Sequence, residues 1–417
     1  MPGQAGRLPA VSIVVVSRHR PGPLAQCLAA LARQSHPECE LILVADPGSI
    51  GLRPDLPIKR ACFDQANISA ARNRGLALAA AEVVLFIDDD AVAAPQWAAA
   101  LAAAFADPGV LAATGFTRGP DGLSWQARAE VIDRSGRSRA LALRDAALLA
   151  PPADGAISTL GTNCGFRAAA LRELGGFDPA FAYHLDESDV NMRMAARWPQ
   201  GLTAVVPQAV VVHGIAPGAG RGPAGVPDDL TAVGRSAAIF AARHGGSTGW
   251  VEAAQRRRLL RLMVAGRLDP GAVGPVLATL RKGLAAGAAL PPPPVPTPFP
   301  AADRPPPFQP LPMRAADPLF LAGWHWQARG LRRQAAQAVA QGRLATLLLL
   351  TPGFLPHRLV LTAQGWWEQR GGLWGRAQPG DRAMLFMPRA DRIRREREYL
   401  PEYAPPPSGK WLQEAEN

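Results

Sequence analysis

Three consecutive carboxylates, Asp88, Asp89 and Asp90, directly follow the apolar run Val83–Ile87. Like charges at the carboxyl end of a buried strand repel one another unless a cation lies between them, and ligands of open α/β sheets bind at that edge. Mg²⁺ and Mn²⁺ take oxygen ligands and commonly bridge protein carboxylates to phosphates. The triplet therefore predicts a metal–phosphate site, and an acidic cap on the strand is the simpler alternative.

A second acidic cluster, Asp186, Glu187 and Asp189, lies about 100 residues further along the chain and is followed by Arg193. Two such clusters suit a site in which one binds a metal diphosphate and the other handles an incoming nucleophile. The second cluster taken alone is also typical of a helix start, where acids in the first turn are favourable.

The elements that must position these residues alternate between strand and helix, which is typical of an α/β domain with a largely parallel sheet. Strands are predicted at Val11–Val16, Glu40–Val44 and Val83–Ile87, and helices after Pro23, around Ala70–Ala80 and after Pro95. Further on, the pattern predicts two short strands, Thr203–Val206 and Ala209–Val212, and helices at Arg235–His244 and Ala253–Leu268. No element can be placed from 117 to 158.

Composition divides the chain into four parts. Residues 291–312 contain 12 prolines in 22 positions, which favours an extended spacer. We therefore predict an α/β domain over 10–250, a helical extension over 251–290, the spacer, and a small basic domain of unknown fold over 313–417. Its tryptophans are Trp324, Trp326, Trp366, Trp367, Trp374 and Trp411, and the simplest interpretation is that they form a core.

The positive charge of the chain lies in its C-terminal part. Residues 1–250 contain 22 basic and 22 acidic residues, whereas 251–417 contain 23 and 12. This surplus predicts peripheral contact of 251–417 with an anionic membrane, and a solvated arginine-rich surface is the alternative. Nucleic-acid binding is not expected, because the tryptophans do not interleave with basic residues in a known motif.

The cysteines and apolar runs bear on the location of the protein. Cys27, Cys39, Cys62 and Cys164 have neither metal-site spacing nor the density of a disulfide scaffold, so reduced thiols are expected. The longest apolar run of the C-terminal part, Leu344–Leu350, is far shorter than the ~20 residues that span a bilayer. A cytoplasmic protein is predicted, with any membrane contact at the inner face of the plasma membrane.

These residues resemble the family 2 glycosyltransferases of the GT-A fold, whose signatures occur here in the family's order over about 200 residues. The matching segments are Ser17–Pro21, Leu43–Ser49, Ala71–Gly75, Asp88–Asp90, Gly161–Arg167 followed by Gly175–Asp178, Asp186–Arg193, and Val212–His213. The resemblance implies a GT-A mixed sheet flanked by helices and an inverting, metal-dependent hexosyltransferase. It further implies a nucleotide-sugar donor, a carbohydrate or lipid-linked acceptor, and a use in surface polysaccharide or glycoconjugate assembly.

The resemblance also assigns the donor side of the site. Asp46 would accept a hydrogen bond from the nucleotide base, and Arg72 would support the ribose or the phosphates. Asp88 and Asp89 would contact the donor. Asp90 would ligate Mn²⁺ or Mg²⁺, and His213 would complete or support the metal site.

On the acceptor side, the resemblance implies roles for Asn163, Asp189 and Arg193. It places the catalytic base on Glu187, with Asp186 as the competing assignment, because the family's usual Glu-Asp order is reversed here. Arg18 and His19 also depart from the family, which usually has an aromatic residue and an amide there.

Two other functions compete with transfer. A sugar nucleotidyltransferase would show a glycine-rich phosphate loop after the first strand, and Ser17–Pro21 has no glycine. A non-catalytic nucleotide-sugar-binding protein could be built on a decayed transferase domain. The intact acids at 88–90 and 186–189 argue against it.

Overall fold

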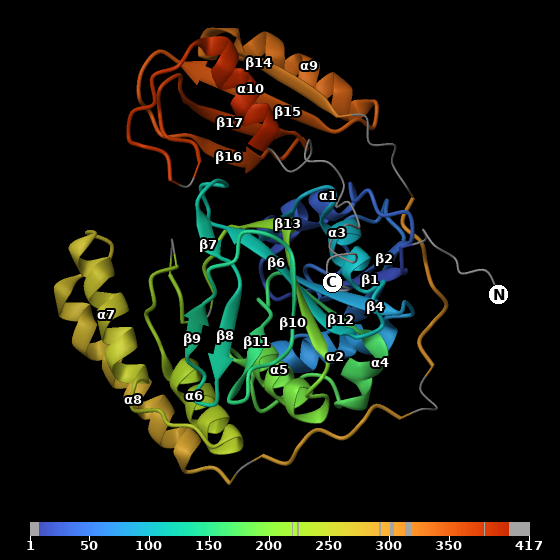
Figure 1. The fold of residues 1–417 in the computed structure, drawn as a ribbon, viewed down its shortest axis with the longest axis vertical. Helices are drawn as coiled ribbons and strands as arrows, with labels where there is room; N and C mark the ends of the chain where they lie inside the picture. The colour runs from blue at the N-terminus through green and yellow to red at the C-terminus, as the bar shows by residue number, and fades with distance from the viewer. Residues whose placement is uncertain are drawn as a thin grey trace, which may run out of the picture.

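The computed structural model describes residues 8–218, 220–222, 225–291, 293–300, 304–312, 318–378 and 380–399 of the chain (Figure 1). Trp411 lies outside these residues.

The N-terminal domain is built on a mixed sheet in the order β10-β13-β6-β12-β4-β1-β2-β3, with β5 paired to β13 and β7 paired to β6. The strands are β1 (Val11–Ser17), β2 (Cys39–Ala45), β3 (Ile58–Cys62), β4 (Val83–Asp88), β5 (Ala91–Ala93), β6 (Val110–Arg118), β7 (Trp125–Ala127), β10 (Ala147–Leu149), β12 (Cys164–Arg167) and β13 (Leu202–His213).

Helices cover both faces of this sheet, as alternation along β1 requires. Val11, Ile13 and Val15 lie in one core cluster, and Val14 lies in the other. The first cluster contains side chains of α1 (Pro21–Leu31) and α3 (Trp97–Ala104), and the second those of α2 (Ile68–Leu78), α4 (Ala168–Glu173) and α5 (Asp186–Arg197). The predicted α/β class, with a mixed sheet between helices, is therefore confirmed.

Two parts of the N-terminal domain differ from the sequence prediction. The region 117–158, where no element was predicted, contains β7, β10 and a separate sheet of β11 (Gly155–Ser158), β8 (Glu130–Asp133) and β9 (Ser138–Ala140). The two short strands predicted around Pro207 are wrong. They form one 12-residue strand, β13, whose register against β6 shifts between Val206 and Val210. Such a bulge accommodates a proline within a strand.

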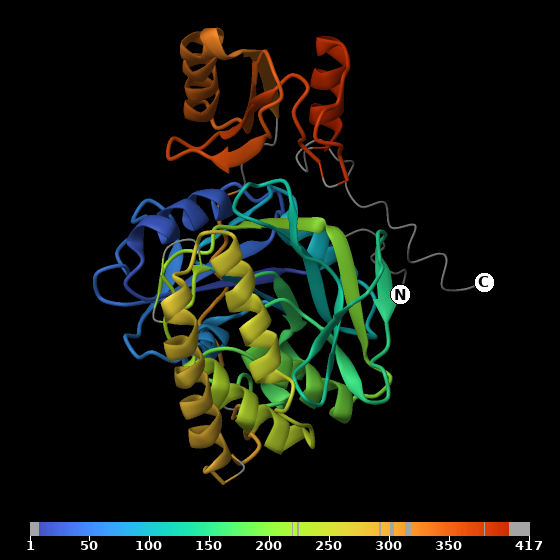
Figure 2. The same ribbon diagram turned by 90° about the vertical axis from the view of Figure 1, so that its left-hand side faces the viewer.

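Three helices follow the sheet: α6 (Thr231–His244), α7 (Val251–Val264) and α8 (Val273–Ala288), with a 3₁₀ turn at Pro270–Ala272. Gly234, Gly283 and Gly287 allow α6 and α8 to approach closely, since a Cβ on any of them would clash with backbone of the partner helix. Figure 2 shows α7 and α8 side by side on the outside of the domain.

The described parts of the proline-rich segment, residues 293–300 and 304–312, are here called the belt. They form no helix and no strand, and Pro310 makes an isolated β-bridge with Glu40. The belt lies against the N-terminal domain instead of standing free. Phe299 N donates to Arg172 O (3.0 Å), Lys59 Nζ to Pro306 O (3.0 Å), and Gln309 N to Glu40 Oε2 (3.0 Å). Figure 1 shows the belt running along the outside of the domain from α8 towards β14.

The C-terminal domain contains a four-stranded sheet in the order β14-β15-β17-β16, with β16 antiparallel to its neighbour. Its elements are β14 (Leu319–Trp324), a 3₁₀ turn (His325–Gln327), α9 (Ala328–Ala340), β15 (Ala345–Thr351), β16 (Arg358–Leu361), β17 (Trp367–Gly372) and α10 (Arg389–Tyr399). Its edge strand β16 faces the N-terminal domain, where Leu359 N donates to Asp121 O (2.8 Å). Leu123 packs with Leu361 and Trp367 at the same contact.

All four cysteines are free, as expected. Within the described part of the chain, no helix combines the length and the apolar character needed to cross a bilayer.

Candidate active site

Asp88, Asp90 and His213 form a group whose ligand atoms all lie within 4.8 Å of one another. Asp88 is the last residue of β4 and His213 the last residue of β13. The short strand β5 pairs with β13, with Ala91 opposite His213, and this pairing brings Asp90 beside the imidazole. Two carboxylates and one imidazole form a donor set that suits Mn²⁺, and the carboxylates alone suit Mg²⁺.

Asp90 is 7% exposed and is surrounded by donors. Its oxygens lie 3.2 Å from His213 Nε2, 3.4 Å from Arg20 Nη1 and 3.5 Å from Arg221 Nη2, and one accepts from Ala216 N at 2.7 Å. Burial alone would raise the pKa of Asp90, but the His213 hydrogen bond and the positive charges hold it well below its usual range. Asp90 is therefore an anion at neutral pH.

His213 is fixed from both sides of its ring. Its Nδ1 lies 2.9 Å from the side-chain amide of Gln126 on β7, and its Nε2 faces Asp90. Burial disfavours the imidazolium, yet the hydrogen bond to Asp90 raises the pKa of His213 above its ordinary value. Gln126 could not be recognised from the sequence, because it lies where no element was predicted.

Asp89 does not line the cavity that Asp88 and Asp90 reach. Its side chain is fully buried and accepts from Ser17 Oγ (2.6 Å) and Arg20 Nε (3.1 Å). Burial raises the pKa of Asp89 to about 7. Asp89 thus holds Arg20 in place, whereas the family resemblance assigned Asp89 a contact with the donor.

Asp46 joins the loops that follow β1 and β2. It accepts from His19 N (2.7 Å) and Gly48 N (3.0 Å). Although burial opposes ionisation, these hydrogen bonds lower the pKa of Asp46. Its carboxylate shapes the loop that carries Arg18 and Arg20, and both arginines line the cavity.

Arg72 links the two acidic clusters that the sequence singled out. Its guanidinium is 2% exposed and donates to Asp186, to Asp88 Oδ1 (3.1 Å) and to Gly161 O (2.9 Å). The guanidinium also lies over the ring of Phe177, 5.3 Å from its centroid. One buried cation therefore holds together the strand end at 88 and the helix start at 186.

Asp186 and Glu187 begin α5 and have different surroundings. Asp186 is paired with Arg72, whereas the nearest Glu187 oxygen lies 3.9 Å from that guanidinium. The Glu187 side chain is 22% exposed, and its pKa is raised well above the ordinary value by burial and by the neighbouring Asp186. Neither residue is among those that line the cavity that Asp88 and Asp90 reach, and Glu187 is the one whose carboxylate is not held in a short contact with Arg72.

Asn163 forms a structural junction in the sheet. Its Oδ1 accepts from Trp97 Nε1 (2.8 Å), and its Nδ2 donates to Phe116 O (3.1 Å) and to Ala209 O (2.8 Å) at the β13 bulge. The residue is fully buried and does not line the cavity. Its side chain is thus committed to β6, β13 and α3, whereas the sequence placed it on the acceptor side.

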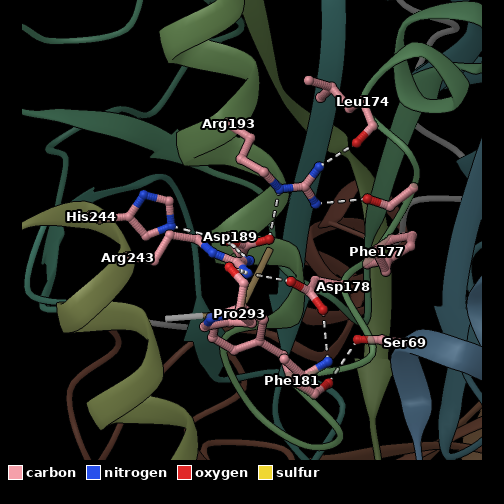
Figure 3. A network of polar contacts seen from close by, with 12 residues as sticks. Ser69, Leu174, Phe177, Asp178, Phe181, Asp189, Arg193, Arg243, His244 and Pro293 are labelled. Carbon is pink, nitrogen blue, oxygen red and sulfur yellow. Dashed lines mark hydrogen bonds and ion pairs between the residues drawn. The ribbon is translucent and has the colours of Figure 1, made fainter. Parts of the chain in front are cut away.

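Asp189 and Arg193 also lie in a buried network, which Figure 3 shows. Asp189 accepts from Arg193 Nε (2.8 Å) and Arg243 Nη1 (3.0 Å) and lies 3.0 Å from His244 Nε2. Arg193 also donates to the carbonyls of Leu174 and Gly176, both at 2.7 Å. These contacts tie α5 to α6 and to the loop after α4, so the pair positions the start of α5 and does not reach the cavity.

The cavity at this edge of the sheet has a volume of about 700 Å³. Its charged lining comprises Arg18, Arg20, Asp88, Asp90, His213, Arg221, Asp229 and Arg235. Four of these residues are arginines, a composition that suits phosphate oxygens. Arg221 and Arg235 come from the segment after β13, which carried no motif in the sequence.

Strained backbone lies beside the site. Five described non-glycine residues have a positive φ, and His19 (57°), Leu185 (65°) and Ile215 (52°) each lie within two residues of a site residue. Such conformations cost about 1–3 kcal/mol each and cluster at functional sites. They occur where the chain turns after β1, before α5 and after β13.

Residues 12–175 match the family model of glycosyl transferase family 2. This segment of the N-terminal domain is therefore similar to the glycosyltransferases of family 2. The match covers β1 to α4, and therefore includes Asp46, Arg72 and the triplet 88–90, but ends before Asp186 and His213.

Individual relatives of the chain are distant. Validoxylamine A glucosyltransferases of Streptomyces hygroscopicus subsp. limoneus and subsp. jinggangensis are 32% and 31% identical over 121 residues. The match spans 26% of this chain and 26% and 28% of those proteins, so about a quarter of their length is represented.

Solved structures similar to the chain include the mannosyltransferase PcManGT from Pyrobaculum calidifontis in complex with GDP-Man and Mn²⁺. It is 18% identical, with a TM-score of 0.39 and coverage of 67% of this chain and 74% of that one. S. aureus TarS is 19% identical, with a TM-score of 0.37 and coverage of 61% and 43%.

Proposed function

We propose that the chain is an inverting glycosyltransferase that moves a hexose from a nucleotide-diphosphate donor to an acceptor hydroxyl with the help of Mn²⁺ or Mg²⁺. One observation carries the proposal: Asp88, Asp90 and His213 converge beside an arginine-lined cavity, and Arg72 joins Asp88 to the second acidic pair. The match of residues 12–175 to glycosyl transferase family 2 supports it.

The donor set fits a divalent cation. Metal–oxygen bonds of ~2.1 Å place neighbouring ligand atoms roughly 3–4 Å apart, so a spread of 4.8 Å needs only a small side-chain adjustment. Asp88, Asp90 and His213 would hold the ion, which would neutralise the diphosphate as it leaves. Because an imidazole is one of the three ligands, we favour Mn²⁺ over Mg²⁺.

The protein's own residues then have distinct roles. Arg18, Arg20 and Arg221 face the cavity and bind phosphate oxygens. Arg72 pairs with both Asp186 and Asp88 and so aligns the two acidic clusters. Glu187 accepts the proton of the acceptor hydroxyl, because its carboxylate lies farther from Arg72 than that of Asp186 and its pKa is raised. The attack on the anomeric carbon opposite the leaving group inverts it.

The acceptor is a carbohydrate or a lipid-linked carbohydrate, and the product belongs to surface polysaccharide or glycoconjugate assembly. Peripheral contact of 251–417 with the inner face of an anionic membrane would bring a lipid-linked acceptor to a cytoplasmic enzyme. The net positive charge of this part supports that placement.

The test is release of nucleoside diphosphate from a panel of nucleotide sugars, with and without Mn²⁺, by the intact protein and by Asp90→Ala. Asp154→Ala is the matched control, because the Asp154 side chain is 89% exposed and lies outside the cavity. We expect metal-dependent release that Asp90→Ala abolishes. Donor binding without hydrolysis would favour the non-catalytic alternative, and pyrophosphate exchange would favour the nucleotidyltransferase.

A further inference from the structure

We infer that the C-terminal domain attaches the protein to an anionic bilayer through one defined surface, the aromatic edge, which comprises Trp326, Phe354, Leu355, Met384 and Phe386. This inference rests on the proposed membrane contact and assigns it to particular residues. Their exposed fractions are 65%, 43%, 63%, 54% and 73%, respectively. A soluble domain rarely exposes so many large apolar side chains together unless they bind something.

The aromatic edge lies at the carboxyl ends of the parallel strands. Trp324 is the last residue of β14, Phe354 and Leu355 follow β15, and Trp374 follows β17. Backbone hydrogen bonds lock these segments together: Gly372 N to Leu355 O (2.8 Å), Trp374 N to Gly353 O (3.1 Å) and Leu385 N to Trp374 O (2.9 Å). The apolar side chains are therefore held in place before any partner arrives, which lowers the entropic cost of binding.

Ring contacts form two groups, and Trp324 of one group and Trp374 of the other pack on the same core cluster of Leu348, Leu350 and Leu373. Trp324 and Trp326 stack with their centroids 5.1 Å apart and their planes at 13°. Phe354 contacts both Trp374 and Phe386, each at 5.6 Å between centroids. Arg389 lies over Trp324, 5.4 Å from the ring centroid. A cation thus borders the aromatic rings directly.

The contact with the transferase domain uses the edge strand β16 and the start of β17. Trp367 is the first residue of β17 and packs with Leu123, Leu359 and Leu361, whereas Trp374 lies beyond the last residue of that strand. A six-residue strand is roughly 20 Å long. The domain therefore docks through β16 and the start of β17, and the aromatic edge lies beyond the end of β17.

Charge and side-chain type identify the occupant as a bilayer. Residues 318–399 contain 13 arginines and five acidic residues, so an anionic surface is attracted. A sugar-binding platform would offer flat ring faces beside polar side chains, but Leu355 and Met384 are not planar and Phe354 meets Phe386 edge-on, at 80°. Exposed leucine, phenylalanine and tryptophan beside arginine are typical of interfacial membrane binding.

The experiment is co-sedimentation of the full chain with vesicles of phosphatidylcholine alone, or of phosphatidylcholine with phosphatidylglycerol, at low and high salt. The test variant is the double substitution Leu355→Ser/Phe386→Ser. The matched control is Val264→Ser, an apolar residue that is 82% exposed on the basic helix α7. Mn²⁺-dependent donor binding is measured on every protein, which separates this inference from the transferase proposal.

We expect salt-sensitive binding to the phosphatidylglycerol vesicles that falls roughly tenfold or more in the double variant, because two apolar side chains no longer enter the interface. Val264→Ser should bind as the unchanged protein does. The inference is overturned if the unchanged protein does not bind at low salt, or if the double variant binds equally well. Loss of binding in Val264→Ser alone would move the membrane site to α7 and overturn it too.

Discussion

The side-chain amide of Gln126 lies 2.9 Å from Nδ1 of His213, so the imidazole turns its Nε2 towards Asp90. A hydrogen bond to the far nitrogen of a histidine ligand orients the ring and fixes its tautomer. Gln126 stands on β7, which pairs with β6. The orientation of a proposed metal ligand thus depends on β7, a short strand that pairs with β6 but lies outside the main strand order of the sheet.

Gln126→Leu should lower the affinity for Mn²⁺ by about 10–100-fold, because the imidazole loses the partner that orients it. The measurement is titration of Mn²⁺ followed by electron paramagnetic resonance. Gln334→Leu, on the exposed side of α9, is the control and should bind Mn²⁺ normally. Unchanged affinity in Gln126→Leu would show that the ring is held by other contacts.

Glu187→Gln should reduce transfer by about 10²–10⁴-fold while donor binding remains, because the amide cannot accept the proton. Transfer by the unchanged protein should fall as the pH is lowered through the raised pKa of Glu187, since only the carboxylate is the base. The measurement is the pH profile of transfer together with donor binding. Asp186→Asn, which removes a partner of Arg72, should impair donor binding as well. Transfer retained in Glu187→Gln and lost in Asp186→Asn would reassign the base.

Asp189→Asn should destabilise the fold at neutral pH. The hydrogen bonds from His244 and the arginines outweigh burial and lower the pKa of Asp189 to about 2, against ~3.9 in an unfolded chain. This difference in pKa contributes about 2–3 kcal/mol to the free energy of unfolding above pH ~4. The contribution is lost as the pH falls from about 4 to about 2.

The free energy of unfolding, measured in urea against pH, tests this prediction. The difference in free energy of unfolding between Asp189→Asn and the unchanged protein should become smaller as the pH falls below 4. The exposed Asp154→Asn should show no such difference. A difference independent of pH would mean that the lost contacts do not depend on the Asp189 charge.

Gly122→Ala should loosen the contact between the two domains. Gly122 has a φ of 74°, and a Cβ there would lie 2.1 Å from the carbonyl oxygen of Leu359 on β16. Gly266 has a φ of 66° with nothing within 4 Å of its would-be Cβ, so Gly266→Ala carries the same backbone strain without the clash. We expect a larger radius of gyration by small-angle scattering in Gly122→Ala only. Equal radii would mean that the clash is absorbed without moving β16.

The strand–helix alternation and the acidic strand end could be predicted from the sequence because both depend on local patterns. Val83–Ile87 is apolar throughout and ends at Asp88, so its burial and the position of the carboxylates follow together. Prolines mark two helix starts for an equally local reason, although α1 begins at Pro21, two residues before the predicted Pro23, and α3 begins two residues after Pro95. In 117–158 the strands are three or four residues long and largely lack an apolar face. Their sequences therefore show no alternation of apolar and polar residues from which a strand could be predicted.

The use of each motif residue could not be predicted in the same way. Asn163, Asp189 and Arg193 are polar, yet their hydrogen-bond partners belong to distant segments, such as Ala209 and Arg243. The neighbours Asp89 and Asp90 differ because successive residues at a strand end point in opposite directions. Which side faces a cavity depends on the packing of α1 and of the segment after β13, and neither is encoded near 88–90.

The belt affects how the protein can be divided. Glu40 is fully buried, pairs with Lys59 at 2.7 Å and also accepts from the backbone of Gln309. A chain shortened at residue 290 would expose this ion pair. It would also remove the carbonyl oxygen of Pro306, which accepts a hydrogen bond from Lys59 Nζ. The N-terminal domain therefore completes its surface with residues synthesised some 270 positions after the strand they cover. During translation that edge stays open until the ribosome has passed the prolines, and a fragment carrying only the family 2 segment would keep it open permanently.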